Sequence, residues 1–149
     1  MRLRLLFLAL AATAGTVIAC VPITDPTSSK PTTPASFMGR PIDVQDNVTV
    51  KSNLVTLRVW DSGTIDGDII SLVVNGQTVL AQYTLTGSKR AVSVALSNGY
   101  NWVMIYAHNE GSIPPNTAAL SIDDGTGERN VVLSANLSTN AAVNVLVQH

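Results

Sequence analysis

The sequence predicts an all-β protein whose folded domain is an antiparallel β-sandwich of immunoglobulin-like or jelly-roll type. Several short segments alternate apolar and polar residues with a period of two, which is typical of strands with one buried face. Turn signals rich in glycine, asparagine and aspartate separate these segments at intervals of about ten residues. No segment shows the pattern of an amphipathic helix.

The most regular part of the chain begins with an alternating strand at residues 54–60. Residues 69–74 are an almost continuous β-branched run, as expected for a strand that is covered on both faces. Asn75 and Gly76 tolerate the positive φ angles of a tight hairpin turn, so residues 77–84 are expected to pair with this run.

The later strands are expected at residues 92–96, 102–108, 118–122, 130–134 and 143–147. Both faces of residues 102–108 are apolar, which predicts a central position in a sheet. Residues 118–122 and 130–134 are expected to form another hairpin across an Asp-Gly-rich loop at residues 123–127.

The N-terminus has the features of an export signal. Arg2 and Arg4 precede an apolar run at residues 5–14 that is too short for a membrane-spanning helix. Residues 17–20, Val-Ile-Ala-Cys, resemble the lipobox of bacterial lipoproteins. The resemblance implies cleavage before Cys20 and lipid attachment to it, and hence a membrane anchor. The alternative is an ordinary secretory leader in which the cysteine occurs by chance.

These features divide the chain into a signal peptide at residues 1–19, a lipidated Cys20 with a linker rich in Pro, Thr and Ser at residues 20–40, and a sandwich domain at residues 41–149. We expect localisation to the bacterial cell envelope. The residue after the cysteine is Val21 and not Asp, which by the lipoprotein sorting rule favours the outer membrane if the cell has one.

Charge and motif content argue against two classes of function. Without Arg2 and Arg4, the chain has seven scattered basic residues and ten acidic ones, a net charge of about −3, so we expect no nucleic-acid partner.

The histidines are His108 and His149, and the sequence has no nucleophile elbow, phosphate loop or histidine pair at metal-ligand spacing. We therefore expect no enzyme activity and no catalytic residue. His108 is expected to be half-buried at the end of its strand.

Two stretches within residues 48–147 resemble a small domain that recurs in secreted and surface proteins of bacteria. The first is Val-Trp-Asp at residues 59–61 with Asp-Gly-Asp at 66–68 and Asn-Gly at 75–76, and the second is Ala-His-Asn-Glu-Gly-Ser-Ile-Pro-Pro-Asn-Thr-Ala at 107–118. The resemblance implies a β-fold outside the cytoplasm, and we associate no established activity with it.

A candidate metal site lies in the loop after residue 60. Asp61, Asp66 and Asp68 provide three carboxylates within eight residues, a donor set that suits calcium, although the spacing is not that of an EF-hand. Asn109 or Glu110 would complete the coordination shell if the two loops meet. The alternative is that each aspartate caps a turn through its own backbone.

The loop at residues 109–117 is expected to be architectural, a crossover that Pro114, Pro115 and Asn116 hold in one shape. The less favoured alternative is a rigid recognition loop.

The function favoured by the sequence is a structural or protein-interaction module. The alternative is calcium-dependent adhesion or carbohydrate binding. A glycan would need an exposed platform among the aromatic residues, most of which are expected in the core, namely Trp60, Tyr83, Tyr100, Trp102 and Tyr106.

Overall fold

The computed structural model describes residues 33–149. This part of the chain contains ten strands: β1 (Ser36–Phe37), β2 (Arg40–Val50), β3 (Leu54–Trp60), β4 (Ile69–Val74), β5 (Gln77–Thr84), β6 (Arg90–Ala95), β7 (Gly99–Ala107), β8 (Asn116–Asp123), β9 (Glu128–Ala135) and β10 (Asn140–Val147). Within the same residues no helix is long and apolar enough to cross a membrane. The predicted signal peptide, Cys20 and most of the predicted linker lie outside the described residues.

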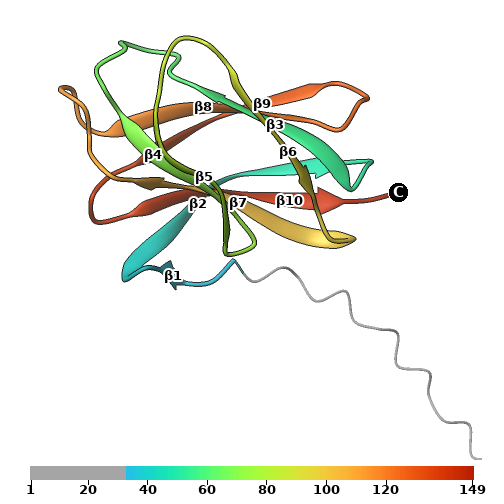
Figure 1. Ribbon diagram of the computed structural model, residues 1–149. Helices are drawn as coiled ribbons and strands as arrows, with labels where there is room; N and C mark the ends of the chain where they lie inside the picture. Colours follow the sequence, from blue (N-terminus) through green and yellow to red (C-terminus); the bar gives the residue numbers. More distant parts are fainter. Residues whose placement is uncertain (1–32) are drawn as a thin grey trace, which may run out of the picture.

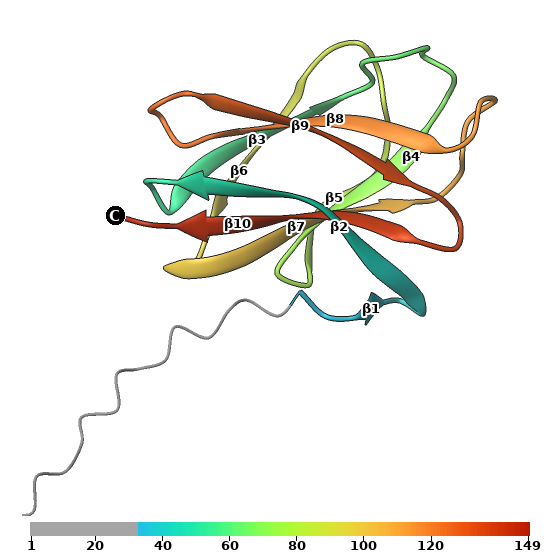
Figure 2. The ribbon, with the colours of Figure 1, turned by 180° about the vertical axis from the view of Figure 1, so that it is seen from behind.

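The strands form two layers (Figures 1 and 2). One sheet has the order β1-β2-β10-β7-β4-β5 and the other has the order β6-β3-β8-β9. All described strand pairs are antiparallel except β2 and β10, which run parallel. The predicted β-sandwich is confirmed.

Alternation along the strands builds the core between the layers. Val55, Leu57 and Val59 of β3 point into this core, where they meet the inward-facing residues of the opposite sheet. The predicted hairpin between β4 and β5 is confirmed, and Asn75 and Gly76 have φ angles of 50° and 87° at its turn. The predicted central position of β7 is also confirmed, because it lies between β10 and β4.

The sequence did not predict β2, which pairs with β10 along most of its length. Most of its side chains are exposed, so it lacks the apolar alternation that marks a strand in the sequence. The register shifts between Ala142 and Val143 of β10, where Gln45 of β2 has no partner in the ladder. This strand depends on a partner about a hundred residues away along the chain, which local patterns do not reveal.

The folded chain begins earlier than the predicted boundary at residue 41. β1 lies within the range assigned to the linker. Phe37 meets Trp102 edge to face with ring centroids 6.3 Å apart, and its carbonyl accepts a hydrogen bond of 3.0 Å from Asn140 Nδ2. Phe37 packs against a second apolar cluster on the outer face of the larger sheet, which includes Val73, Trp102 and Met104.

Candidate metal site

Two loops meet at one end of the sandwich. The loop of residues 61–68 connects β3 to β4, and the loop of residues 108–115 connects β7 to β8 (Figures 1 and 2). Asp61 directly follows β3, Asp68 directly precedes β4, and Asp66 lies on the loop between them. One carboxylate oxygen from each of the three lies within 4.8 Å of the others. The predicted triad is therefore assembled in space and could hold a metal ion.

Each of these aspartates uses one oxygen to hold the backbone. Asp61 Oδ1 accepts a hydrogen bond of 2.9 Å from the Gly63 amide within its own loop. Asp66 Oδ2 accepts one of 2.7 Å from the amide of Ile113 on the facing loop. Asp68 Oδ2 accepts one of 3.0 Å from the amide of Thr117 at the start of β8. The turn-capping alternative therefore holds for one oxygen of Asp61 alone, because Asp66 and Asp68 accept from amides of a distant segment.

The remaining oxygens of Asp61 and Asp68 have no such role. Asp61 is 6% exposed and Asp68 is 3% exposed. Asp61 Oδ2 and Asp68 Oδ1 are buried without a hydrogen-bond donor among the described residues. Leaving part of a buried charge without a partner costs about 1–3 kcal/mol or more, so such oxygens call for an explanation. A bound cation would supply the missing partner.

The local electrostatics agree with this interpretation. Burial raises the pKa of Asp68, and the negative charges of Asp66, Asp61 and Glu110 raise it further, while the hydrogen bond from the Thr117 amide opposes the shift. Ionisation of Asp68 is therefore less favourable in the metal-free protein than it is for a free aspartate. A divalent cation reverses this effect, since it stabilises the carboxylate.

The sequence left open whether Asn109 or Glu110 completes the coordination shell. Asn109 Oδ1 accepts a hydrogen bond of 2.6 Å from the Ile69 amide, and its Nδ2 donates one of 2.8 Å to the Gly67 carbonyl. This side chain therefore joins the two loops, and its amide is already engaged with backbone. Glu110 contributes negative charge near Asp68 and does not belong to the group of close carboxylates.

The loop of residues 109–117 is a crossover between the two sheets, as predicted. Asn116 is buried, and its Nδ2 donates to the carbonyls of Asn109 and Ile69 at 3.2 and 3.5 Å. Together with the triad, the loop encloses a hollow of about 180 Å³. The loop thus has both an architectural role and a place in the wall of the site. The residues that line the hollow are Asp61, Gly63, Thr64, Asp66, Asp68, Ile113, Pro115 and Thr117.

A second acidic loop, between β8 and β9, provides a contrast. Asp124 Oδ2 accepts from the Lys51 amide at 2.7 Å. Its Oδ1 accepts from the hydroxyl and amide of Thr126 at 2.6 and 3.0 Å and from Arg129 at 3.3 Å. These donors hold the pKa of Asp124 well below its ordinary value. Both of its carboxylate oxygens accept hydrogen bonds from the protein, so, unlike Asp61 and Asp68, Asp124 has no oxygen that lacks a partner.

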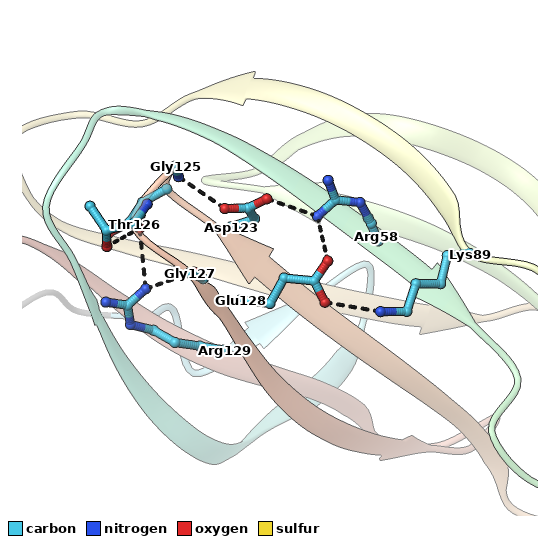
Figure 3. A network of polar contacts seen from close by, with 9 residues as sticks. Arg58, Lys89, Asp123, Gly125, Thr126, Gly127, Glu128 and Arg129 are labelled. Carbon is cyan, nitrogen blue, oxygen red and sulfur yellow. Dashed lines mark hydrogen bonds and ion pairs between the residues drawn. The ribbon is translucent and has the colours of Figure 1, made fainter.

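Ion pairs continue from this loop across the four-stranded sheet (Figure 3). Arg58 contacts Asp123 at 3.1 Å and Glu128 at 2.9 Å, and Lys89 contacts Glu128 at 2.9 Å. The hydrogen bonds from the Gly125 amide and Arg58 lower the pKa of Asp123. The network joins β3, β8 and β9 and balances its own charges, so we interpret it as structural.

His108 lies just after β7 and is exposed, so the prediction of a half-buried histidine is wrong. Its Nε2 is 2.8 Å from Ser71 Oγ, which also accepts a hydrogen bond of 3.1 Å from the Gln82 amide. The ring also packs edge to face against Tyr106. No carboxylate hydrogen bonds to this histidine among the described residues, so the pair lacks the third group of a catalytic triad.

The aromatic residues do not follow the prediction that most of them lie in the core, because only Trp102 is buried. Each of the half-buried rings has a cationic side chain over one face: Lys89 at 4.6 Å from Trp60, Arg40 at 4.1 Å from Tyr106 and Arg90 at 6.0 Å from Tyr83. Tyr100 is 37% exposed. In residues 33–149 no two of these five rings stack on each other, so a paired aromatic platform for a glycan is not formed.

Comparisons with family models, with curated proteins and with solved structures found no match in any of the three.

Proposed function

We propose that the sandwich is a calcium-binding module that acts by binding and not by catalysis. The observation that carries the proposal is the pair of buried carboxylate oxygens, Asp61 Oδ2 and Asp68 Oδ1, that lack a donor beside a third carboxylate, Asp66. Calcium takes roughly six to eight oxygen ligands at about 2.3–2.6 Å and tolerates irregular geometry, as loops provide.

The origin of the triad favours calcium over magnesium. The three carboxylates come from one loop, and their oxygens lie within 4.8 Å of one another. Calcium tolerates the irregular geometry that a loop provides, whereas magnesium demands near-ideal octahedral geometry and keeps several of its bound waters. We therefore expect calcium to bind more tightly than magnesium.

Thermal unfolding of the chain from Val21 onwards, without lipid, tests the proposal. Calcium at about a hundredfold excess over its dissociation constant should stabilise the native state by about 2.7 kcal/mol, a shift of roughly ten degrees relative to metal-free protein. Magnesium should shift the melting temperature less. Coincident melting curves with and without calcium would contradict the proposal.

Asparagine variants separate the metal site from general stability. Asp61→Asn and Asp68→Asn keep the shape of each side chain and the oxygen that accepts from the Gly63 or Thr117 amide. Both should lose the calcium response. Without calcium, Asp68→Asn should melt at or above the temperature of the unaltered chain, because a buried negative charge is removed. The matched control is Asp46→Asn on the exposed edge of β2, which should keep the full calcium response.

The lipobox-like segment supports a lipid anchor on Cys20 at the bacterial cell envelope, with the outer membrane favoured where one exists. The linker would then hold the module away from the membrane. Cys20→Ser should abolish incorporation of radiolabelled palmitate and release the protein from the membrane fraction. If this variant still incorporates palmitate and stays in the membrane fraction, the anchor proposal is contradicted.

A protein partner bound along the edge strand β6 is a second candidate function. At one seam between the sheets, Gln45 on β2 bridges to β9, since its side-chain amide exchanges two hydrogen bonds of 2.9 Å with the Ser134 backbone. At the opposite seam, a hollow of about 430 Å³ separates β5 from β6 and has an uncharged lining. The free edge of β6 could pair with an extended segment of a partner.

A charge on this edge tests the second candidate. Ala95 is exposed and lines the hollow between β5 and β6. Ala95→Lys should prevent capture of a partner from envelope extracts, because a lysine on an edge strand opposes strand pairing. Val132→Lys on β9, at a site that is 59% exposed, should have no effect. Equal capture by both variants would rule out β6 as the docking edge.

A further inference from the structure

We propose that calcium held by Asp61, Asp66 and Asp68 binds, on its solvent side, the adjacent hydroxyl groups of an uncharged sugar. This inference rests on the proposed calcium site and adds the class of ligand that the site recognises. Four features of the site support it: the number of protein ligands, the local charge, the size of the hollow and the apolar rim.

The triad leaves calcium with open coordination positions. Three carboxylates that each offer one oxygen supply about half of the roughly six to eight ligands that calcium takes. The amide of Asn109, on the facing loop, is already hydrogen bonded to the backbone of Ile69 and Gly67. The hollow beside the triad reaches the surface, since the exposed residues Thr64 and Ile113 form part of its wall. A ligand from solvent can therefore approach the ion.

The charge of the site selects against anions. Three carboxylates exceed the charge of one divalent cation by one negative charge, and Glu110 adds a further negative charge near Asp68. A phosphate, a sulfate or a uronic acid would therefore approach a site that remains negative after it is loaded. Neutral oxygen donors avoid this repulsion.

Among neutral donors, adjacent hydroxyl groups have an advantage over a single carbonyl. A vicinal diol replaces two calcium-bound waters with one molecule, so less translational freedom is lost per ligand oxygen than with two separate donors. A peptide carbonyl provides one oxygen, and the bidentate group that a peptide can offer is a carboxylate, which the local charge disfavours. The hollow of about 180 Å³ has room for a single small ring.

Apolar side chains beside the triad can contact the C–H groups of such a ring. Ile113, on the facing loop, is 58% exposed and lines the hollow. The Ile113 amide donates to Asp66 Oδ2, so the rim is tied to the metal ligands. The exposed Pro115 also lines the hollow.

The test uses the chain from Val21 onwards and three probes: the methyl glycosides of mannose, galactose and fucose, each of which carries a vicinal diol. Binding is followed by the broadening of the glycoside proton signals in NMR spectra, with calcium and after its removal. We expect the proton signals of at least one probe to broaden with calcium and to stay sharp after its removal. The proton signals of methyl glucuronate should broaden about tenfold less than those of the neutral probe that binds.

Substitutions at the rim separate sugar contact from metal binding. Ile113→Ser removes the apolar contact and retains the backbone amide, so it should weaken sugar binding about tenfold while the calcium-induced rise in melting temperature persists. The matched control is Val132→Ser, at a site on β9 that is 59% exposed and should have no effect on either property.

The outcomes distinguish the two proposals. A calcium-induced rise in melting temperature without broadening of any probe would overturn the sugar inference and leave the calcium site standing. Equal broadening with and without calcium would also overturn it. If calcium leaves the melting curve unchanged, the proposed function fails, and the inference fails with it. Broadening by methyl glucuronate alone would show that the charge argument is wrong.

Discussion

Gly111 lies so close to Asp66 that a methyl group on Gly111 would overlap the Asp66 carboxylate. The glycine also has a φ angle of 55°, which most other residues adopt at a cost. The backbone of the second loop can approach the triad at this point because no side chain intervenes. The absence of a Cβ atom thus helps to bring the two loops together.

Gly111→Ala should therefore destabilise the domain and weaken calcium binding, because either the Asp66 carboxylate or the loop must shift to make room for the methyl group. Gly99→Ala is the matched control, since Gly99 has a φ angle of 79° and nothing within 4 Å of an added methyl group. The control should lose about 1–2 kcal/mol of stability from backbone strain alone. Calorimetric titration with calcium measures the difference. Equal calcium affinity in both variants would argue against the close approach as a determinant of the site.

The raised pKa of Asp68 predicts a pH dependence of stability in metal-free protein. The ordinary value is 3.8, and the folded state retains the proton to higher pH than the unfolded chain does. The contribution of Asp68 to stability is most favourable below this value and is lost as pH rises through the raised pKa. Asp68→Asn should remove this loss, so the variant should gain stability relative to the unaltered chain as pH rises. Urea denaturation of metal-free samples between about pH 4 and pH 8 measures the gain. A difference that does not vary with pH would contradict the prediction.

Asp124→Ala should destabilise the domain without affecting calcium binding. The substitution leaves the Lys51 amide and the Thr126 amide and hydroxyl without their shared acceptor. The expected loss is about 1–3 kcal/mol in the free energy of unfolding, measured by urea denaturation. The calcium-induced rise in melting temperature should persist. Loss of that rise would indicate that the second acidic loop also contributes to metal binding.

Phe37→Ala should destabilise the domain and expose Trp102 to solvent. Phe37 covers the outer apolar cluster of the larger sheet, and its ring meets that of Trp102. Removal of a half-buried aromatic ring should cost about 1–2 kcal/mol and shift the tryptophan emission to longer wavelength. Met38→Ala is the control, because Met38 is 70% exposed and should be neutral. Unchanged emission and stability in Phe37→Ala would mean that residues 36–40 do not contribute to the fold.

The amino-acid sequence alone determined the strands that bury apolar side chains with a regular period. Strands β3, β4 and β7 were predicted in this way, and Asn75-Gly76 marked the β4–β5 hairpin because few dipeptides accept positive φ at both positions. The sequence also indicated Asp61, Asp66 and Asp68 as candidate metal ligands, since they are close along the chain.

Only the tertiary structure decided which oxygens of that group lack a partner. The Gly63 amide, which occupies one oxygen of Asp61, is local, but the Ile113 and Thr117 amides come from about fifty residues further along the chain. Strand β2 likewise depends on a distant segment, because its parallel partner β10 lies near the C-terminal end of the sequence. Burial and hydrogen-bond satisfaction depend on contacts between distant segments, so local patterns identify the donor set and the fold determines whether the set is complete.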